Sequence, residues 1–198
     1  GEGSTVYPLK RTSPIPSVEN AEELKERFDS IFDEDLIRII TSSDIDQWSE
    51  MGWRGIMLDD GILWMDYDGK ITAVNYQSKY EKKLAKKLTS KVKGDLSSDL
   101  RHNFKGEVYK FKTKNYFIRI DELKNGMYRY ACWKKENPES TKPDLVLENG
   151  KIEFSGSGGN HVITFKNNIY EYKVFHNKIA ASGIADITLV VEKNGKEI

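Results

Sequence analysis

The sequence predicts an α+β N-terminal domain over residues 1–95, followed by an all-β domain over residues 104–198 that forms an eight-stranded antiparallel barrel or tight sandwich. Two observations predict this organisation. Apolar residues in the first half follow helical spacing and then short β-prone runs, whereas the second half consists almost entirely of alternating runs between turn signals. A Gly- and Ser-containing stretch near residues 94–104 separates the halves, and 198 residues suffice for two domains of about 100 each.

The composition is that of a folded protein, with 38% apolar and 11% aromatic residues. Formal charge is zero, from 31 basic and 31 acidic residues, so overall charge favours no polyanionic partner such as nucleic acid. The charge is nevertheless uneven along the chain. Residues 19–50 hold eleven acidic and three basic residues, whereas residues 79–93 hold seven lysines and one glutamate. No apolar run reaches the length of a membrane span.

The first elements are an extended segment and one or two helices. Residues 1–19 contain three prolines and scattered small polar residues, which is typical of extended chain. Asn20 and Glu23 have the spacing of a capping box, and the apolar residues behind them predict a helix over 21–32. The apolar run 36–40 fits either a second short helix or a helix-to-strand transition.

A short meander and a lysine-rich helix complete the first half. The β-prone runs 55–58, 62–65 and 71–74 are separated by two Asp-Gly pairs, which predict hairpin turns. Residues 79–92 have helical spacing with lysines outside a narrow apolar stripe. Because that stripe lacks Trp and Phe, it favours a solvated linker helix over one that docks an acidic partner or anionic lipid.

The second half contains eight candidate strands between turn signals. They cover residues 107–112, 115–121, 127–134, 144–148, 151–155, 161–166, 169–176 and 184–192. Tight turns are predicted at Asn125-Gly126, Asn149-Gly150 and Asn167-Asn168. Eight sequential strands leave two exposed edges unless the sheet closes, which favours a barrel filled by its own side chains.

The most unusual segment is the glycine-rich stretch 154–161 between two of these strands. Its glycines allow the backbone to approach another surface closely, and its polar groups are Ser155, Ser157, Asn160 and His161. We weigh a partner-binding loop against a plain hairpin connection. A phosphate cradle is not predicted, because the glycines precede a strand and not a helix N-terminus.

No catalytic or metal-binding arrangement stands out, so the sequence predicts a protein that is not an enzyme and has no metal or other cofactor. His102, His161 and His176 have no metal-ligand spacing, and Cys132 lies in a strand-like run where a buried, inert thiol is expected. The chain contains neither Gly-x-Ser-x-Gly nor His-Glu-x-x-His. The oligomeric state is not predictable from these features.

Aromatic residues around the first meander offer an alternative site. Trp53, Trp64 and Tyr76 could line a small-ligand or cell-wall-fragment pocket in a half-open α+β cone. The competing interpretation is that these rings belong to the core.

The first half resembles uncharacterised exported bacterial proteins. The resemblance lies in Tyr7-Pro-Leu-Lys-Arg11, Phe28-Asp-Ser-Ile-Phe32, Gly52-Trp-Arg-Gly-Ile-Met-Leu58 and Gly61-Ile-Leu-Trp64. It implies a nuclear-transport-factor-like cone, truncated here because a first helix should precede Tyr-Pro-Leu. It also implies export to the periplasm or cell surface, with a lipid anchor on a removed N-terminal segment as one form. The sequence itself fits the cytoplasm as well.

The second half resembles the periplasmic and membrane-bound lysozyme inhibitors, which are eight-stranded antiparallel barrels. Ser157-Gly-Gly-Asn-His161 is similar to the Ser-Gly-x-x-Tyr loop of that family, with His in place of Tyr and without the usual disulfide. The resemblance implies a lysozyme-like hydrolase or another envelope protein as partner. The implied binding residues are Ser155, Ser157, Gly158, Gly159, Asn160, His161, Tyr170 and Lys173.

Overall fold

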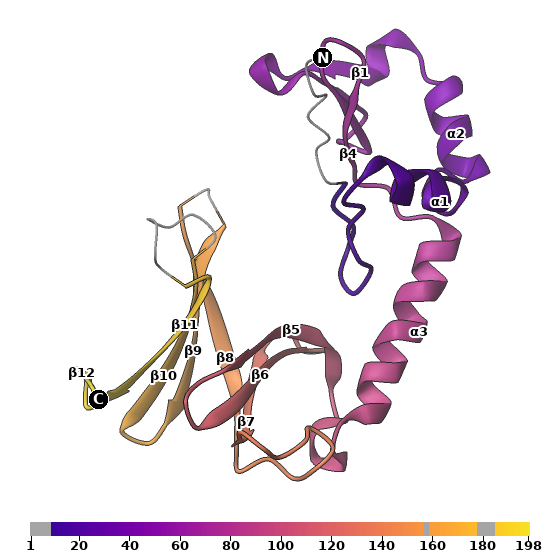
Figure 1. Ribbon diagram of the computed structural model, residues 1–198. Helices are drawn as coiled ribbons and strands as arrows, with labels where there is room; N and C mark the ends of the chain where they lie inside the picture. Colours follow the sequence, from indigo (N-terminus) through magenta and orange to yellow (C-terminus); the bar gives the residue numbers. More distant parts are fainter. Residues whose placement is uncertain (1–8, 157–158, 178–184) are drawn as a thin grey trace. The chain divides into compact units, whose positions relative to one another are not determined.

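The computed structural model describes residues 9–156, 159–177 and 185–198 (Figure 1). The chain divides into two units, Gly1–Ser90 and Lys91–Ile198. The first unit contains α1 (Ala21–Ile31), α2 (Glu34–Thr41), β1 (Trp48–Glu50), β2 (Ile56–Leu58), β3 (Leu63–Met65) and β4 (Ile71–Val74). Its four strands form one antiparallel sheet in the order β1-β2-β3-β4. The predicted meander is therefore confirmed, with β1 added at its edge.

Side-chain caps explain where the first two helices begin. The Asn20 side chain accepts a hydrogen bond from the backbone N–H of Glu23 at 3.0 Å, which confirms the predicted start of α1. Asp33 does the same for the N–H of Leu36 at 3.0 Å. This cap places residues 36–40 in α2, so the helical alternative for that run is the one observed.

A buried ion pair ties the extended N-terminal segment to α3 (Lys79–Asp95). Arg11 and Glu81 form a two-pronged pair with almost no exposed side-chain surface. The Arg11 guanidinium also donates to the carbonyls of Val74 and Tyr76 at 2.6 and 2.8 Å. These bonds satisfy a buried charge, which would otherwise be costly. Among the described residues, no helix has the length and apolarity needed to cross a membrane.

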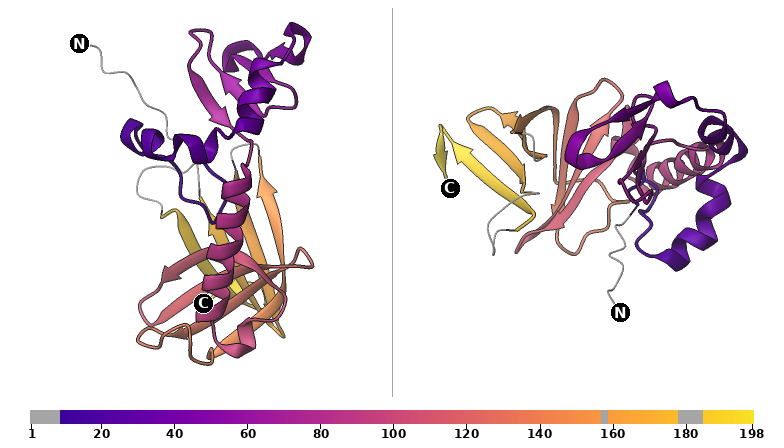
Figure 2. Two further views of the ribbon diagram at one scale, coloured as in Figure 1. Left: turned by 90° about the vertical axis from the view of Figure 1, so that its right-hand side faces the viewer. Right: turned by 90° about the horizontal axis from the view of Figure 1, so that it is seen from above.

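The second unit is built on an eight-stranded antiparallel sheet, coloured from rose to yellow in Figures 1 and 2. Its strands are β5 (Phe104–Lys112), β6 (Tyr116–Leu123), β7 (Tyr128–Lys134), β8 (Leu145–Ser155), β9 (Asn160–Asn167), β10 (Tyr170–His176), β11 (Ile187–Lys193) and β12 (Lys196–Glu197). Each pairs with its neighbour in sequence. Within the described ranges no ladder joins β5 to β12, so hydrogen bonds do not close the sheet into a barrel.

The predicted tight turn at Asn149-Gly150 is wrong. Both residues lie inside β8, which pairs with β7 before this point and with β9 beyond it. Asn149 adopts a φ of 62°, and the pairing with β7 shifts register here, so the strand bends without reversing. The two strands expected over 144–148 and 151–155 are therefore one, and the short β12 brings the number to eight.

The two faces of the sheet bury different kinds of residue. One face packs an apolar core around Ile118, Ile163, Phe165 and Val174, all of which are fully buried. The opposite face of β6 and β7 packs Trp133 against residues from the end of α3 and the segment that follows it.

An ionic network also lies on this opposite face. The Asp121 carboxylate accepts from Arg119 Nε at 2.6 Å and from Arg129 Nη2 at 3.0 Å, and all three side chains are buried. Burial raises the pKa of the Asp121 carboxyl, while the two guanidinium groups act in the opposite direction.

Candidate functional site

Four aromatic rings meet at the end of the sheet where β8 and β9 are joined. We call Tyr109, Phe154, His161 and His176 the ring cluster. Phe154, His161 and His176 are cross-strand neighbours on β8, β9 and β10, whereas Tyr109 comes from β5. Ring centroids lie 4.9 Å apart for His161–His176, 5.3 Å for Phe154–His161 and 5.3 Å for Tyr109–His176. Side chains from β5, β8, β9 and β10 therefore meet beside the connection between β8 and β9, a place that we call the hairpin base.

A chain of hydrogen bonds orders this base. His161 Nδ1 lies 2.9 Å from the carbonyl oxygen of Gly159, and His161 Nε2 lies 2.6 Å from the Tyr109 hydroxyl. Since a carbonyl only accepts, we assign the proton to Nδ1, so that Nε2 of the neutral ring accepts from Tyr109. Burial raises the pKa of Tyr109 to about 12, which keeps its hydroxyl protonated and able to donate.

Within the ring cluster, the exposed Phe154 side chain is the group that a partner can reach. The Phe154 side chain is 67% exposed, although its ring is held beside His161. His176 Nδ1 is buried without a hydrogen-bond partner among the residues that the structure describes.

The glycine-rich segment supplies the hairpin itself. Ser155 pairs with Asn160 in the ladder, and Gly159 adopts a φ of 85°, a left-handed conformation that favours glycine. The structure thus brings together four of the expected loop residues: Ser155, Gly159, Asn160 and His161. Ser157 and Gly158, which the sequence also indicated, lie outside the described residues.

Tyr170 and Lys173 do not lie beside this hairpin. Tyr170 pairs with Asn167 at the opposite end of β9 and β10, six residues from His176 along a strand, or about 20 Å at 3.3 Å per residue. Lys173 pairs across the ladder with Thr164, which places it on the other face from His176, and its ammonium group contacts Glu192 at 2.6 Å.

The aromatic residues of the alternative pocket also lie apart. Trp53 is 93% exposed, the Trp64 ring stacks with the Arg54 guanidinium at 5.6 Å, and the Tyr76 hydroxyl donates to Asp33 at 3.2 Å. No ring contact joins the three among the described residues. One hollow of the first unit, of about 300 Å³, is lined by other residues: Asp33, Glu34, Asp35, Lys79 and Tyr80.

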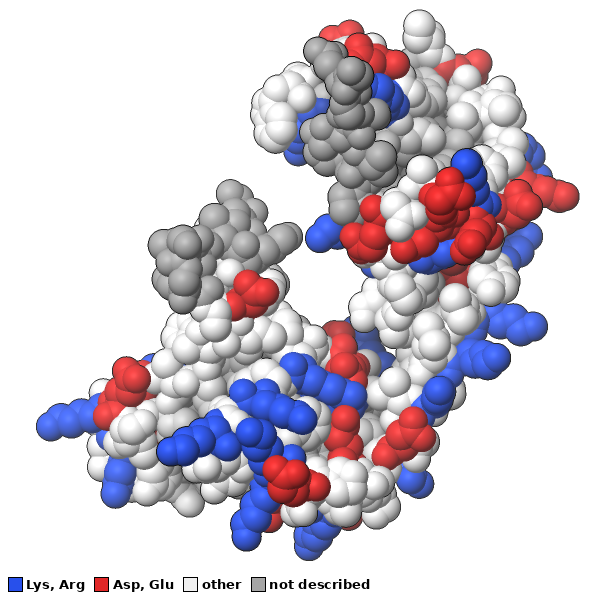
Figure 3. Space-filling model, viewed as in Figure 1, with Lys and Arg blue, Asp and Glu red and all other residues white. Residues whose placement is uncertain are grey.

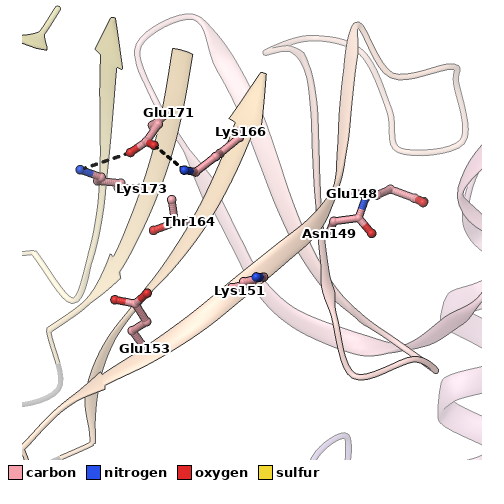
Figure 4. Close-up of a pocket in the computed structure, with 8 residues that line it drawn as sticks. All are labelled: Glu148, Asn149, Lys151, Glu153, Thr164, Lys166, Glu171 and Lys173. Carbon is pink, nitrogen blue, oxygen red and sulfur yellow. Dashed lines mark ion pairs between the residues drawn. The ribbon is translucent and has the colours of Figure 1, made fainter. Parts of the chain in front are cut away.

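A larger hollow of about 730 Å³ lies over the outer face of β8, β9 and β10 (Figure 4). It is lined by Glu148, Asn149, Lys151, Glu153, Thr164, Lys166, Glu171 and Lys173. Glu171 stands between Lys166 and Lys173, at 3.1 and 3.7 Å, and Lys173 also pairs with Glu192. These charges neutralise one another, so the hollow has no excess charge to attract an ion.

Sequence reasoning did not predict Phe154, Tyr109 or His176 as binding residues of the site. For His176 a signal existed, because a tight turn at Asn167-Asn168 fixes the register that sets His176 opposite His161. Tyr109 reaches the ring cluster because the whole sheet is curved, and no short sequence pattern predicts that curvature.

The structure gives no sign of metal or thiol chemistry within the described ranges. No group of three or more His, Cys, Asp or Glu residues there could hold a metal ion. Cys132 is buried, as expected, and burial raises the pKa of its thiol, which disfavours the reactive thiolate. Comparison with known proteins gave no match, whether with family models, with curated proteins or with solved structures.

Proposed function

We propose that this chain is a non-enzymatic binding protein whose second unit binds a partner protein at the β8–β9 hairpin. The observation that carries the proposal is the exposed Phe154 ring on a base ordered by the Tyr109–His161–Gly159 hydrogen bonds. An aromatic anchor that is held in place before binding loses little conformational freedom on docking. The exposed Ser155, which follows it in the chain, would add a directional contact through its hydroxyl.

The partner class that we propose is a lysozyme-like hydrolase of the cell envelope, which places the protein outside the cytoplasm. The resemblance of Ser157-Gly-Gly-Asn-His161 to an inhibitory loop supports this class. Hydroxyl and imidazole groups can donate hydrogen bonds to the paired carboxylates of such an enzyme. The barrel form belongs to the same proposal, and contacts of Tyr109 on β5 with His161 and His176 support a sheet that curls over itself.

The test is inhibition of c-, g- and i-type lysozymes acting on a cell-wall suspension, with direct binding measured in parallel. We expect inhibition of at least one class. Phe154→Ser should raise the inhibition constant about thirtyfold, which is the loss of affinity typical of an interface hot spot. Ile169→Ser is the matched control, because Ile169 is 48% exposed just beyond the opposite end of β9.

Two outcomes contradict the proposal at different points. Full activity of all three lysozymes, with no binding, removes this partner class. Inhibition that Phe154→Ser leaves as strong as before, with circular dichroism unchanged, removes the hairpin as the binding site.

A further inference from the structure

Helix α3 has one face made of lysines. At about 100° per residue, five lysines fall on one half of the helix, with Leu84, Leu88 and Val92 on the other half. The five are Lys82, Lys83, Lys86, Lys87 and Lys91. All five are exposed, and blue side chains line this helix in Figure 3. From Lys82 to Lys91 the lysine face covers about 14 Å at 1.5 Å per residue, so it is a short straight strip.

This strip is not neutralised by the chain. None of these five lysines forms an ion pair with a described residue, whereas Lys110, Lys166 and Lys173 on the strands all do. The single acidic residue of α3 before Asp95 is Glu81, which is buried against Arg11.

The strip also weakens its own helix. Lys82–Lys86, Lys83–Lys87 and Lys87–Lys91 are like-charged pairs at a spacing of four residues, which destabilises an α-helix. Glutamates at some of these positions would give the same solubility with attraction in place of repulsion. Among the described residues, Lys82 Nζ lies 5.9 Å from the centre of the Tyr76 ring, a weak attraction that leaves the repulsion between the other lysines in place. We therefore expect the compensation from a partner that carries negative charge.

We propose that the lysine face of α3 binds the surface of an anionic lipid bilayer. Lysine is a mobile point charge that suits a field of headgroups, whereas specific recognition of one phosphate or carboxylate favours the planar fork of arginine, which α3 lacks. Tyr80 is the single aromatic residue of α3, whereas a single-stranded nucleic acid is held by a succession of rings on which its bases stack. A straight strip of about 14 Å can lie along a plane over its whole length.

The helix would lie on the headgroups without entering the hydrocarbon. Its apolar stripe is used within the protein, since Val92 packs against the core around Trp133, and Leu84 and Leu88 are half-buried. Binding that rests on charge alone must respond steeply to salt and to lipid charge. These two dependences distinguish it from insertion of an amphipathic helix.

The test is co-sedimentation of the full chain with vesicles of phosphatidylcholine alone or with 30% phosphatidylglycerol. We expect binding only to the anionic vesicles, and its loss in 0.5 M NaCl. The variant with Lys82, Lys83, Lys86 and Lys87 changed to Gln should lose binding by at least a hundredfold, since each lysine contributes about fivefold. The matched control changes four exposed lysines of the second unit, Lys112, Lys114, Lys124 and Lys135, to Gln and should retain most of the binding.

Three results would overturn the proposal. Equal binding to both vesicle types shows that charge is not the determinant. An equal loss of vesicle binding in the two fourfold variants would show that the net charge of the chain determines binding, and not the position of the lysines on α3. Tighter binding of a duplex or single-stranded oligonucleotide than of the anionic vesicles would reassign the strip to nucleic acid.

Discussion

At the scale of single residues, the hydroxyl of Tyr109 links β5 to the hairpin. It donates to His161 at 2.6 Å from a strand that is not a ladder neighbour of β9. Tyr109→Phe keeps the ring contacts and removes only this bond, which should cost about 0.5–1.5 kcal/mol of unfolding free energy near neutral pH. Urea denaturation measures it. A larger loss would mean that the ring packing itself had been disturbed.

The same residue predicts a response to alkaline pH. Burial raises the pKa of Tyr109 to about 12, above the value near 10 of an unfolded tyrosine. A raised folded-state pKa means that the unfolded chain loses its proton first. The stability that this group contributes is therefore complete below pH 10 and is lost between pH 10 and pH 12. Thermal unfolding at pH 9 and pH 11 should show a smaller alkaline loss in Tyr109→Phe than in the natural chain.

A second buried tyrosine limits how much of the alkaline loss of stability Tyr109→Phe can remove. Tyr76, whose pKa is also raised to about 12 by burial, remains in the variant, so Tyr109→Phe should remove only part of the loss. Identical alkaline losses in the two proteins would show that Tyr109 ionises as freely in the folded state as in the unfolded one.

At the scale of elements, the turn residues in the sequence predicted the ends of most strands. One of the predicted turns does not form. Gly126 and Asn168 have φ values of 80° and 55° in the connections between β6 and β7 and between β9 and β10, as Asn125-Gly126 and Asn167-Asn168 predicted. Asn149 has a similar φ of 62°, yet its strand continues. An Asn-Gly pair indicates that the backbone adopts a left-handed conformation. Whether the chain then reverses depends on the strands that flank β8, which local sequence does not specify.

Gly150 is the residue at which β8 passes closest to the Phe165 ring. A Cβ atom at this position would lie 2.2 Å from Cε1 of Phe165, whose ring is fully buried and cannot move aside. Gly150→Ala should therefore lower the unfolding free energy by about 1–3 kcal/mol through overpacking. The measurement is urea denaturation followed by circular dichroism.

Two further variants identify the cause of that loss. Gly106→Ala is the control, since a Cβ on Gly106 of β5 meets no atom within 4 Å and its effect should be small. Gly150→Ala combined with Phe165→Leu should be less destabilised than the sum of the two single changes. Simple additivity would show that the ring is not what excludes a side chain at position 150.

At the scale of the whole molecule, a formal charge of zero conceals the separation of charge along the chain. The acidic run and the lysine-rich run were both evident from sequence. The sequence did not show that Glu81 forms a buried ion pair with Arg11. Because of that pair, Glu81 does not neutralise the lysine face of its own helix. The sequence also favoured a solvated linker for α3, because its narrow apolar stripe lacks Trp and Phe. Charge on α3 therefore has a cost that stability measurements can detect.

Changing Lys82, Lys83, Lys86 and Lys87 to Gln should make the isolated protein more stable. Glutamine forms helices about as well as lysine, and each like-charged pair removed relieves about 0.2–0.5 kcal/mol. The rise in thermal midpoint should be largest near 20 mM salt and small at 0.5 M, where the Debye length falls to a few ångströms. Differential scanning calorimetry at the two salt concentrations measures it, with the fourfold variant at Lys112, Lys114, Lys124 and Lys135 as the comparison. A fall in midpoint at low salt would show that these lysines stabilise the fold, and would remove the repulsion on which the lipid-binding role of α3 was inferred.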